Sequence, residues 1–567
     1  MLSSPRVHSV AALVLSCSTV VLAQQQPVIP TPSDLERKSL DLKAAPNLVP
    51  PSPVPRKISA PDEDIKLEVI RYELPLNAPA DLRKALPKLT EPYLGKDRSF
   101  GDIANAAREV TAYLQAELGY YLGIAYIPEQ EPRDGVIQIA VLEGRLDDIE
   151  LVWTEGLPVA REVVESYLRQ LAPGSVLLVR DVERLVFLLN DLRGIASTFE
   201  VRSGSMPGTA KLVVTVKPTQ STEWRTEFDN ANALDLGRNR VSATVVRNSP
   251  FNRGDSLSAT IMTANKGMTF GMTSYTTPVG PNGMRVGAAI SKLEYQVVKG
   301  TFANSGLEGQ ASTTAVFGLY PVIRSRNINL FTTGGVDAKS YEDFNGFFKT
   351  NKRVNTVNIG VTGDMRDNLA GGGLNSMDAM LVSGQVKQDR TLGTDLPAAR
   401  FNKLAVRGVR LQNIVPGVFQ GYASVRLQKA FDNLDSTEQF RAGGPDGVRA
   451  FFPGEGTGDS GLQATLELRW LIPKQWLADN NIGGDSSIAL FTDWATVRKR
   501  NDTSTQLPGF INREDYSGTG FAWQWNGPKG WSVRTSIAKQ YKAPKNSDGT
   551  FRYDREKHFF INVSKQN

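Results

Sequence analysis

The chain has almost no cysteine or histidine. Its 567 residues include one cysteine, Cys17, and two histidines, His8 and His558. Disulfides, thiolate metal sites and cysteine nucleophiles are therefore excluded beyond the first residues. His558 is the only histidine that could serve as a base in the rest of the chain, which removes most acid–base and metal chemistry. We expect no enzymatic activity, no metal and no cofactor.

Long apolar runs are also scarce. Arg6 and His8 precede a largely apolar stretch over residues 10–22, and Val-Leu-Ala at 21–23 is an acceptable cleavage box, so residues 1–23 are predicted to be a secretory signal peptide. Processing as a lipoprotein at Cys17 is the second choice. After the signal no apolar run reaches 18 residues, which excludes a spanning helix. A soluble exported protein and a membrane barrel both remain possible, because the alternating residues of barrel strands do not raise the mean hydropathy.

Charge of one sign is not concentrated anywhere. The formal net charge is +6, but the 65 basic and 59 acidic residues are interspersed. This is typical of a mixed solvated surface, so no nucleic-acid partner is expected.

The stretch after the signal divides into two parts. Residues 24–45 hold cap residues, an early proline and good helix formers, which predicts a polar helix with Leu35, Leu40 and Leu42 as its apolar positions. Residues 46–64 are rich in proline and are expected to form a semi-rigid linker. Composition alone would also fit a disordered tail.

Two successive modules follow. Residues 65–144 have the pattern strand, helix, helix, strand, strand, with Ile103, Val110 and Leu114 at helical spacing. Residues 145–217 repeat this order with little residue identity, which indicates an internal repeat. Each module is predicted to be a small α+β domain, and neither contains a catalytic constellation.

The remaining 350 residues (567 minus 217), 218–567, change character. Apolar and polar side chains alternate in many short segments; in 462–470, for example, Leu, Ala, Leu, Leu and Trp alternate with Gln, Thr, Glu and Arg. A soluble sandwich also alternates. However, the region follows a signal and two modules, and Trp and Phe recur near the ends of the apolar faces, as in an interfacial girdle. We therefore predict a mainly β fold that ends in an antiparallel transmembrane barrel of about 16 strands.

One glycine-rich stretch, 443–461, does not look like an ordinary surface loop. It carries a lone cation, Arg449, between the bulky residues Val448 and Phe451, and the strand pattern of 462–470 follows at once. Bulky side chains beside one cation favour a loop folded back into a wet interior.

Apparent enzyme signatures in this stretch fail on context. Gly-Thr-Gly-Asp-Ser-Gly at 456–461 fits the dinucleotide pattern, but a strand follows it where a helix is required. Gly-Asp-Ser-Gly at 458–461 is similar to a serine-protease nucleophile loop, but no suitable base accompanies it. The spacing of Asp446, Glu455 and Asp459 matches no calcium loop, and solvation is the simpler explanation.

The strand pattern allows a charge pair across the barrel region. In the strand pattern 488–497, Phe491 and Asp493 share one face, while Leu490 and Trp494 share the other. If the second face meets lipid, Asp493 points into the lumen, where Arg449 from an inward-folded loop can make a forked contact with it. On the residues alone, an ordinary surface loop arginine is the favoured interpretation of Arg449.

Two motifs make the resemblance to a family specific. The loop holds Val448-Arg449-Ala450-Phe451, and a later strand holds Phe491-Thr492-Asp493-Trp494-Ala495. The chain resembles the outer-membrane transporters of two-partner secretion, of the hemolysin-activator or filamentous-hemagglutinin-transporter type, whose motifs are Val-Arg-Gly-Tyr and Phe-x-Asp-x-Gly. Here alanine replaces glycine at 450 and 495, and phenylalanine replaces tyrosine at 451. The resemblance covers nearly the whole chain.

The resemblance implies a fold and a function. The two modules would be POTRA domains in the periplasm of a Gram-negative bacterium, the helix at 24–45 would plug the resting pore, and 443–461 would line it. The transporter would export one secreted TpsA-type exoprotein, an adhesin or hemolysin, unfolded and without ATP. The edges that would bind it hold Tyr120, Tyr121, Ile124, Tyr126, Phe199 and Val201. Outer-membrane lipid, the barrel-assembly machinery and periplasmic chaperones would be further partners.

Three rival functions stay open at this stage. An outer-membrane insertase shares the POTRA modules and the arginine loop but usually has more modules. A diffusion porin has no need of residues 65–217. A periplasmic binding protein or enzyme would lack the barrel.

Overall fold

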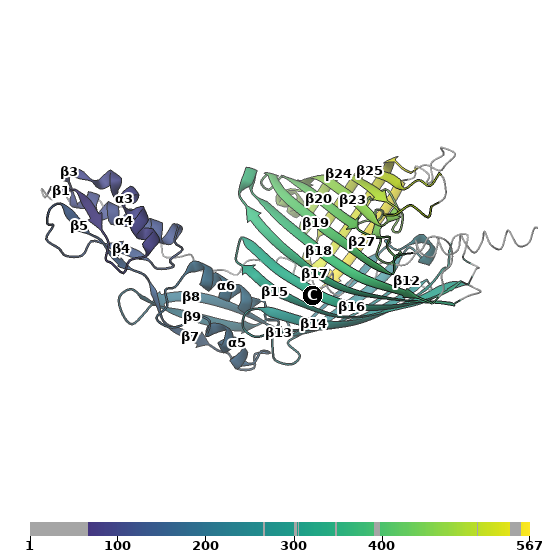
Figure 1. The fold of residues 1–567 in the computed structure, drawn as a ribbon, viewed down its shortest axis with the longest axis horizontal. Helices are drawn as coiled ribbons and strands as arrows, with labels where there is room; N and C mark the ends of the chain where they lie inside the picture. The colour runs from purple at the N-terminus through teal and green to yellow at the C-terminus, as the bar shows by residue number, and fades with distance from the viewer. Residues whose placement is uncertain are drawn as a thin grey trace, which may run out of the picture.

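The structure is a computed structural model that describes residues 66–264, 267–299, 303, 306–345, 349–389, 397–506, 509–544 and 557–567. The expected signal peptide, the helix at 24–45 and the linker at 46–64 lie outside these ranges. No helix within them is long and apolar enough to cross a membrane. Figure 1 shows two small modules in a row beside one large barrel.

Sixteen antiparallel strands close into the barrel, which confirms the predicted fold. Each strand pairs with the next barrel strand along the chain, and the first pairs with the last from Arg225↔Gln566 to Asp229↔Asn562. The strands are β10 (Thr222–Asp229), β11 (Arg240–Asn248), β12 (Ser256–Ala264), β13 (Met268–Val279), β14 (Met284–Gln296), β15 (Leu307–Arg324), β16 (Ile328–Asn345), β17 (Lys349–Asp367), β18 (Gly373–Gln388), β19 (Arg400–Val415), β20 (Phe419–Ala430), β23 (Ser460–Leu471), β24 (Asp485–Arg498), β25 (Arg513–Asn526), β26 (Trp531–Lys542) and β27 (Lys557–Gln566).

Alternation along each strand sorts the side chains between the two sides of the wall. On β17, Lys352, Val354 and Thr356 are buried on the inner side, while Val357 and Ile359 are 60% and 66% exposed on the outer side. Large aromatic residues also stand on the outer side, among them Trp470, Trp523, Trp531 and Phe559. An apolar outer band with aromatic edges beside a polar interior is the pattern of a barrel in lipid.

The first module packs two helices on short strands. Its helix α4 (Phe100–Ala116) begins with a capping box between Ser99 and Asp102. The buried face of α4 packs with Ile137 in the module core. The other elements are β1 (Leu67–Val69), β2 (Arg71–Glu73), α3 (Ala80–Thr90), β3 (Gly95–Arg98), β4 (Ile124–Tyr126), β5 (Val136–Gln138) and β6 (Ala140–Leu142).

The second module has one three-stranded sheet in the order β7-β9-β8. β7 (Arg145–Val152) pairs in parallel with β9 (Thr209–Pro218), and β8 (Ile195–Ser203) pairs with β9 in antiparallel fashion, so β8 is an edge strand. The helices α5 (Arg161–Leu168) and α6 (Val179–Asn190) contribute their apolar faces to the same core.

An ion pair joins the second module to the barrel. Arg324, at the end of β15, donates from Nε and Nη2 to the two carboxylate oxygens of Asp191 at 2.9 and 2.7 Å. Its guanidinium lies 4.8 Å from the ring centroid of Phe187 on α6. Arg285 donates to the backbone carbonyl of Asp191 at 3.1 Å. We call this end of the barrel the module end and the opposite end the far end.

We predict that Asp191→Ala loosens the second module from the barrel. The change leaves Arg324 without its carboxylate, and a forked charged contact contributes roughly 1.5–3 kcal/mol. Spin labels at Glu162→Cys and Ala478→Cys would report the distance between module and barrel, and it should become broadly distributed. Glu200→Ala, which removes an exposed pair with Arg202 in the same module, is the control. An unchanged distribution in Asp191→Ala would contradict a clamping role.

Candidate functional site

The connection between β20 and β23, residues 431–459, lies inside the barrel. It contains the two short paired strands β21 (Phe440–Arg441) and β22 (Thr457–Gly458). Its side chains contact the inner side of β16 and β19 through Glu438, and the inner side of β24 through Arg449. Since these strands belong to different parts of the wall, the segment, called here the luminal loop, occupies the interior. Val448, Ala450 and Phe451 are completely buried.

Arg449 is tied to Asp493 by three hydrogen bonds. Nε donates to Oδ2 at 2.9 Å, Nη2 donates to Oδ1 at 2.8 Å, and the backbone N–H donates to Oδ2 at 3.0 Å. Asp493 is completely buried, and Arg449 is 8% exposed. The planar guanidinium matches the carboxylate, while the backbone bond fixes the loop itself and not only the side chain.

Two further groups complete the contact, and the sequence analysis missed both. Glu467 on β23 accepts from Arg449 Nη1 at 2.7 Å, and Thr465 donates its hydroxyl to Asp493 at 2.9 Å. The guanidinium carbon lies 3.3 Å from the ring centroid of Phe491. Both missed residues alternate on the same face of β23, so the pattern of 462–470 placed them inside without identifying their partner.

Electrostatics keep this arginine charged. Burial lowers the pKa of Arg449, but the hydrogen bonds and charges of Asp493 and Glu467 outweigh it and hold the pKa above its usual value. Elsewhere in the luminal loop, burial raises the pKa of Glu455 to about 7, although the carboxylate accepts a hydrogen bond from the backbone of Phe452. Glu455 caps a turn of the loop and makes no ion pair with a described residue.

The tip of the luminal loop fits against Gly518 on the wall. A Cβ at Gly518 would lie 2.3 Å from the Cβ of Ala450, and one at Gly520 would lie 2.8 Å from the ring of Phe491. The carbonyl of Ala450 accepts a hydrogen bond from Gln540 at 2.9 Å. Gly518 therefore supplies the space that the tip occupies, while Gly520 leaves room for the wall residues Phe491 and Ile537.

The predicted motif residues meet in one apolar cluster. Val448, Ala450, Phe451, Phe491 and Ala495 are all members. Phe451 packs edge-on against Tyr516, with ring centroids 5.0 Å apart. Each alanine that stands in place of the family's glycine is thus buried in a packed contact.

A second group of ions anchors the loop to another part of the wall. Glu438 accepts from Lys339 on β16 at 2.7 Å and from Lys403 on β19 at 2.9 Å. Lys352 on β17 donates to Asp435 at 3.0 Å. All five side chains are at most 12% exposed. The luminal loop is therefore held on two sides of the lumen.

The predicted edge residues of the modules have different surroundings. The backbone of Tyr121 donates to Leu177 of the second module at 2.9 Å, and Tyr120 forms a bridge with Leu178. This part of the edge is therefore already paired. Ile124 and Tyr126 on β4 are 37% and 42% exposed. Phe199 and Val201 lie on the edge strand β8, where Phe199 points into the core. Leu35, Leu40 and Leu42 lie outside the described residues.

The acidic residues of the loop act as structural groups. Asp459 is completely buried and accepts hydrogen bonds from the backbone of Leu434 and Asn501 and from the side chain of Gln439. Within the described ranges no group of three or more His, Cys, Asp or Glu side chains could hold a metal ion.

We predict that Gly518→Ala displaces the loop tip and that Ala450→Gly reverses the effect. The new methyl group would overlap that of Ala450, and overpacking of this kind costs roughly 1–3 kcal/mol. The single variant should have a lower unfolding temperature in detergent, and its luminal loop should be cleaved faster by added protease.

The double variant Ala450→Gly/Gly518→Ala should return toward the original chain in both measurements. Gly271→Ala is the matched control, because a Cβ there meets no atom within 4 Å. Equal behaviour of Gly518→Ala and Gly271→Ala would show that the loop tip is not packed as described.

Comparisons with known proteins agree with this architecture. A family model described as POTRA domain, ShlB-type, matches residues 69–144, and one described as haemolysin secretion/activation protein ShlB/FhaC/HecB matches residues 208–511. The chain is 22% identical over 396 residues to the heme/hemopexin transporter protein HuxB of Haemophilus influenzae, covering 68% of this chain and 69% of HuxB.

It is also 22% identical over 487 residues to the outer membrane transporter CdiB of Escherichia coli O6:K15:H31, covering 82% of this chain and 78% of that protein. The solved structure of CdiB from Escherichia coli has the same fold, with a TM-score of 0.71, 18% identity and full coverage of both chains.

The ShlB/FhaC/HecB model covers more than half of the chain, and the barrel and POTRA module fit it. This is a family of secretion transporters. The module end of the barrel faces the periplasm and the far end faces the cell exterior. The chain belongs to the ShlB/FhaC/HecB family of haemolysin secretion/activation proteins, the outer-membrane transporters of two-partner secretion.

Proposed function

We propose that this chain exports one exoprotein, as an unfolded chain, through a lumen that the luminal loop occupies at rest. The observation that carries the proposal is the buried fork between Arg449 and Asp493, which holds the loop tip against the wall. A polypeptide can pass only if this loop shifts, so the fork fixes the resting arrangement. The partner would be an adhesin, a hemolysin or a similar secreted protein.

The way in which the loop is held favours local and reversible movement. Its anchors include ion pairs and hydrogen bonds, for which water and a passing chain can compete, beside the apolar contacts of Val448, Ala450 and Phe451. No Gly-x-x-x-x-Gly-Lys-Ser/Thr motif occurs in the chain, so we assign no role to ATP. Folding of the exported protein outside the cell would supply the direction.

The POTRA modules would capture the exoprotein by strand addition. β8 is an edge strand of its sheet, and main-chain hydrogen bonds to such an edge provide affinity without demanding one sequence. Ile124 and Tyr126 offer exposed apolar side chains on the first module. Since Tyr120 and Tyr121 already contact the second module, we assign capture to β4 and β8.

Other partners would act during the biogenesis of the barrel. Insertion into the outer membrane would require the barrel-assembly machinery, and periplasmic chaperones would carry both the precursor and the exoprotein. Residues 24–45 would plug the resting pore beside the luminal loop, and residues 46–64 would give that helix its reach.

We predict that Arg449→Ala leaves an assembled barrel that secretes little or no exoprotein. Removal of one partner from a buried ion pair costs about 3–5 kcal/mol, and the loop tip would leave the wall. Secretion of a cognate exoprotein from cells and heat-modifiable gel migration are the two measurements. Asp446→Ala, which removes an exposed charge from the same loop, is the control. Normal secretion by Arg449→Ala would remove the assigned role.

Deletion of residues 24–45 tests the plug separately. We expect a higher single-channel conductance in planar bilayers, because the lumen would keep only the luminal loop as an obstacle. A deletion of equal length cannot be matched elsewhere, so a variant with Leu35, Leu40 and Leu42 changed to Ser serves as the comparison. Unaltered conductance in both variants would contradict the plug.

A further inference from the structure

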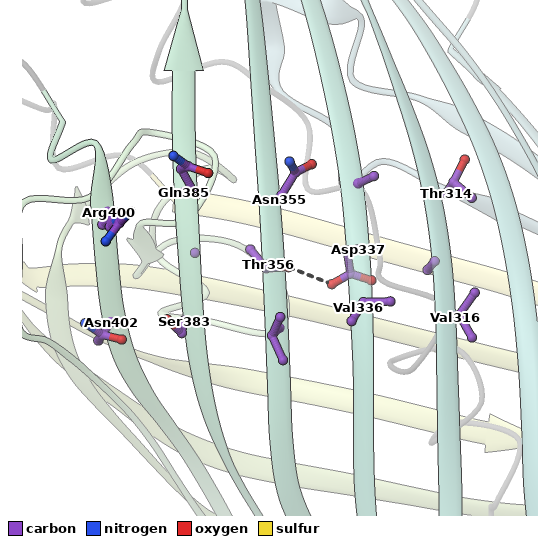
Figure 2. A pocket seen from close by; sticks show the side chains of 14 residues that line it. Thr314, Val316, Val336, Asp337, Asn355, Thr356, Ser383, Gln385, Arg400 and Asn402 are labelled. Atoms are coloured by element: carbon purple, nitrogen blue, oxygen red, sulfur yellow. Dashed lines mark hydrogen bonds between the residues drawn. The ribbon is translucent and has the colours of Figure 1, made fainter.

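A shallow groove of about 770 Å³ lies on the outer side of the barrel wall, across β15–β19. Two rows of cross-strand partners line it, as Figure 2 shows. The upper row is Thr314, Ala338, Asn355, Gln385 and Arg400, and the lower row is Val316, Val336, Val357, Ser383 and Asn402. The groove therefore lies where the outer side changes from polar to apolar.

The orientation of these side chains follows from their neighbours. On β19, Phe401 is completely buried in a cluster inside the barrel and Lys403 contacts Glu438 of the luminal loop. Arg400 and Asn402 alternate with them and are exposed, so they point outward. On β17 the same alternation places Val357 outside at 60% exposure.

Basic residues gather around the groove at the far end of the same strands. Arg353 on β17 and Lys387 on β18 are direct cross-strand partners. Arg400 lies diagonally below Lys387, because its direct partner is Gln385. Lys429 on β20 stands apart from these three, because it lies opposite Leu404, four residues beyond Arg400 on β19 and past the lower row. All four basic side chains are exposed on the outer side.

These cations are not neutralised within the described chain. None of the ion pairs between described residues includes Arg353, Lys387, Arg400 or Lys429, and like charges directly opposite each other destabilise a sheet. The neighbouring acidic residues make contacts with other groups. Glu342 pairs with Lys349 at 2.6 Å, and Asp389 and Asp432 accept backbone hydrogen bonds at 2.9 Å from Asn351 and Asn402.

We propose that this outer groove and the three cations at its upper row, Arg353, Lys387 and Arg400, bind a phosphorylated glycolipid of the outer leaflet of the outer membrane. The far end faces the cell exterior, so the cations stand at the level of that leaflet, directly above the aliphatic band. Arg and Lys provide charge-assisted donors for phosphate. Thr314, Asn355, Gln385 and Asn402 supply neutral hydrogen-bonding groups for a sugar, while Val316, Val336 and Val357 meet acyl chains.

Location and charge together favour a lipid over a soluble ligand. A soluble anion would need only the basic residues, whereas the groove continues into side chains that face the hydrocarbon. The exoprotein would reach the lumen and the periplasmic modules, not the outer side of the wall. A membrane glycolipid carries both the phosphate that the basic residues would bind and the acyl chains that the apolar side chains would contact.

The test uses the full-length chain in phosphatidylcholine vesicles that contain purified lipid A. The double variant Arg353→Gln/Lys387→Gln is compared with Lys474→Gln/Lys529→Gln, which removes the same charge from periplasmic turns. After detergent extraction, lipid A bound per protein is counted by native mass spectrometry. We expect retention by the original chain and the control, and a loss of about tenfold or more in the groove variant, since two charged contacts are removed.

Three further arms identify the ligand. Dephosphorylated lipid A should bind weakly, and neither millimolar inorganic phosphate nor an acidic peptide should displace the lipid. Equal retention by both double variants, equal binding of the dephosphorylated lipid, displacement by free phosphate or displacement by the peptide would each overturn the proposal. Heat-modifiable migration of every variant establishes that its barrel is folded, and unchanged secretion would separate this site from the transport function.

Discussion

The arrangement of this transporter depends on one buried charge inside its barrel. A guanidinium taken out of water is stable only where carboxylates surround it in good geometry, and Arg449 meets that condition at Asp493 and Glu467. The same contact uses the backbone N–H of Arg449, so the position of the charge and the path of the luminal loop are set together. A hydrophobic contact of equal area would hold the loop less specifically, since apolar surfaces can slide.

The packing of the other luminal residues is consistent with a loop tip fixed by Arg449. Space for the tip comes from Gly518, and the methyl group of Ala450 occupies it. The departures from the family's motif at 450 and 495 are therefore accommodated by packing on the wall and do not disturb the charge pair. Glu438, paired with Lys339 and Lys403, holds the loop on the other side of the lumen, so the loop is attached to the wall at two places.

The sequence predicted the parts that depend on local pattern. Alternation indicated strands and their two faces, and it placed Asp493 on the inner side of β24. A lone arginine among bulky residues indicated an inward loop. The family's Phe-x-Asp-x-Gly motif pointed to Asp493 as the partner of this arginine. Glu438 and Lys339 could not be found in this way, because 99 residues separate them and only the closed register brings them together. Gly518 also gave no signal, since its importance depends on which methyl group stands opposite.

Charged side chains stand on both sides of the barrel wall, and their charges are compensated in different ways on the two sides. Charges on the inner side are covered by the luminal loop and pair with it: Lys339, Lys352 and Lys403 contact its acidic residues, and Asp493 contacts its Arg449. Charges on the outer side at the far end border lipid instead, and Arg353 and Lys387 stand opposite each other without a described counter-ion. Their strand partners do not neutralise them, because Arg353 and Lys387 face each other and the other partner of Arg353 is Ser340. In the arrangement proposed above, the compensating charge comes from phosphate groups of the leaflet that surrounds them.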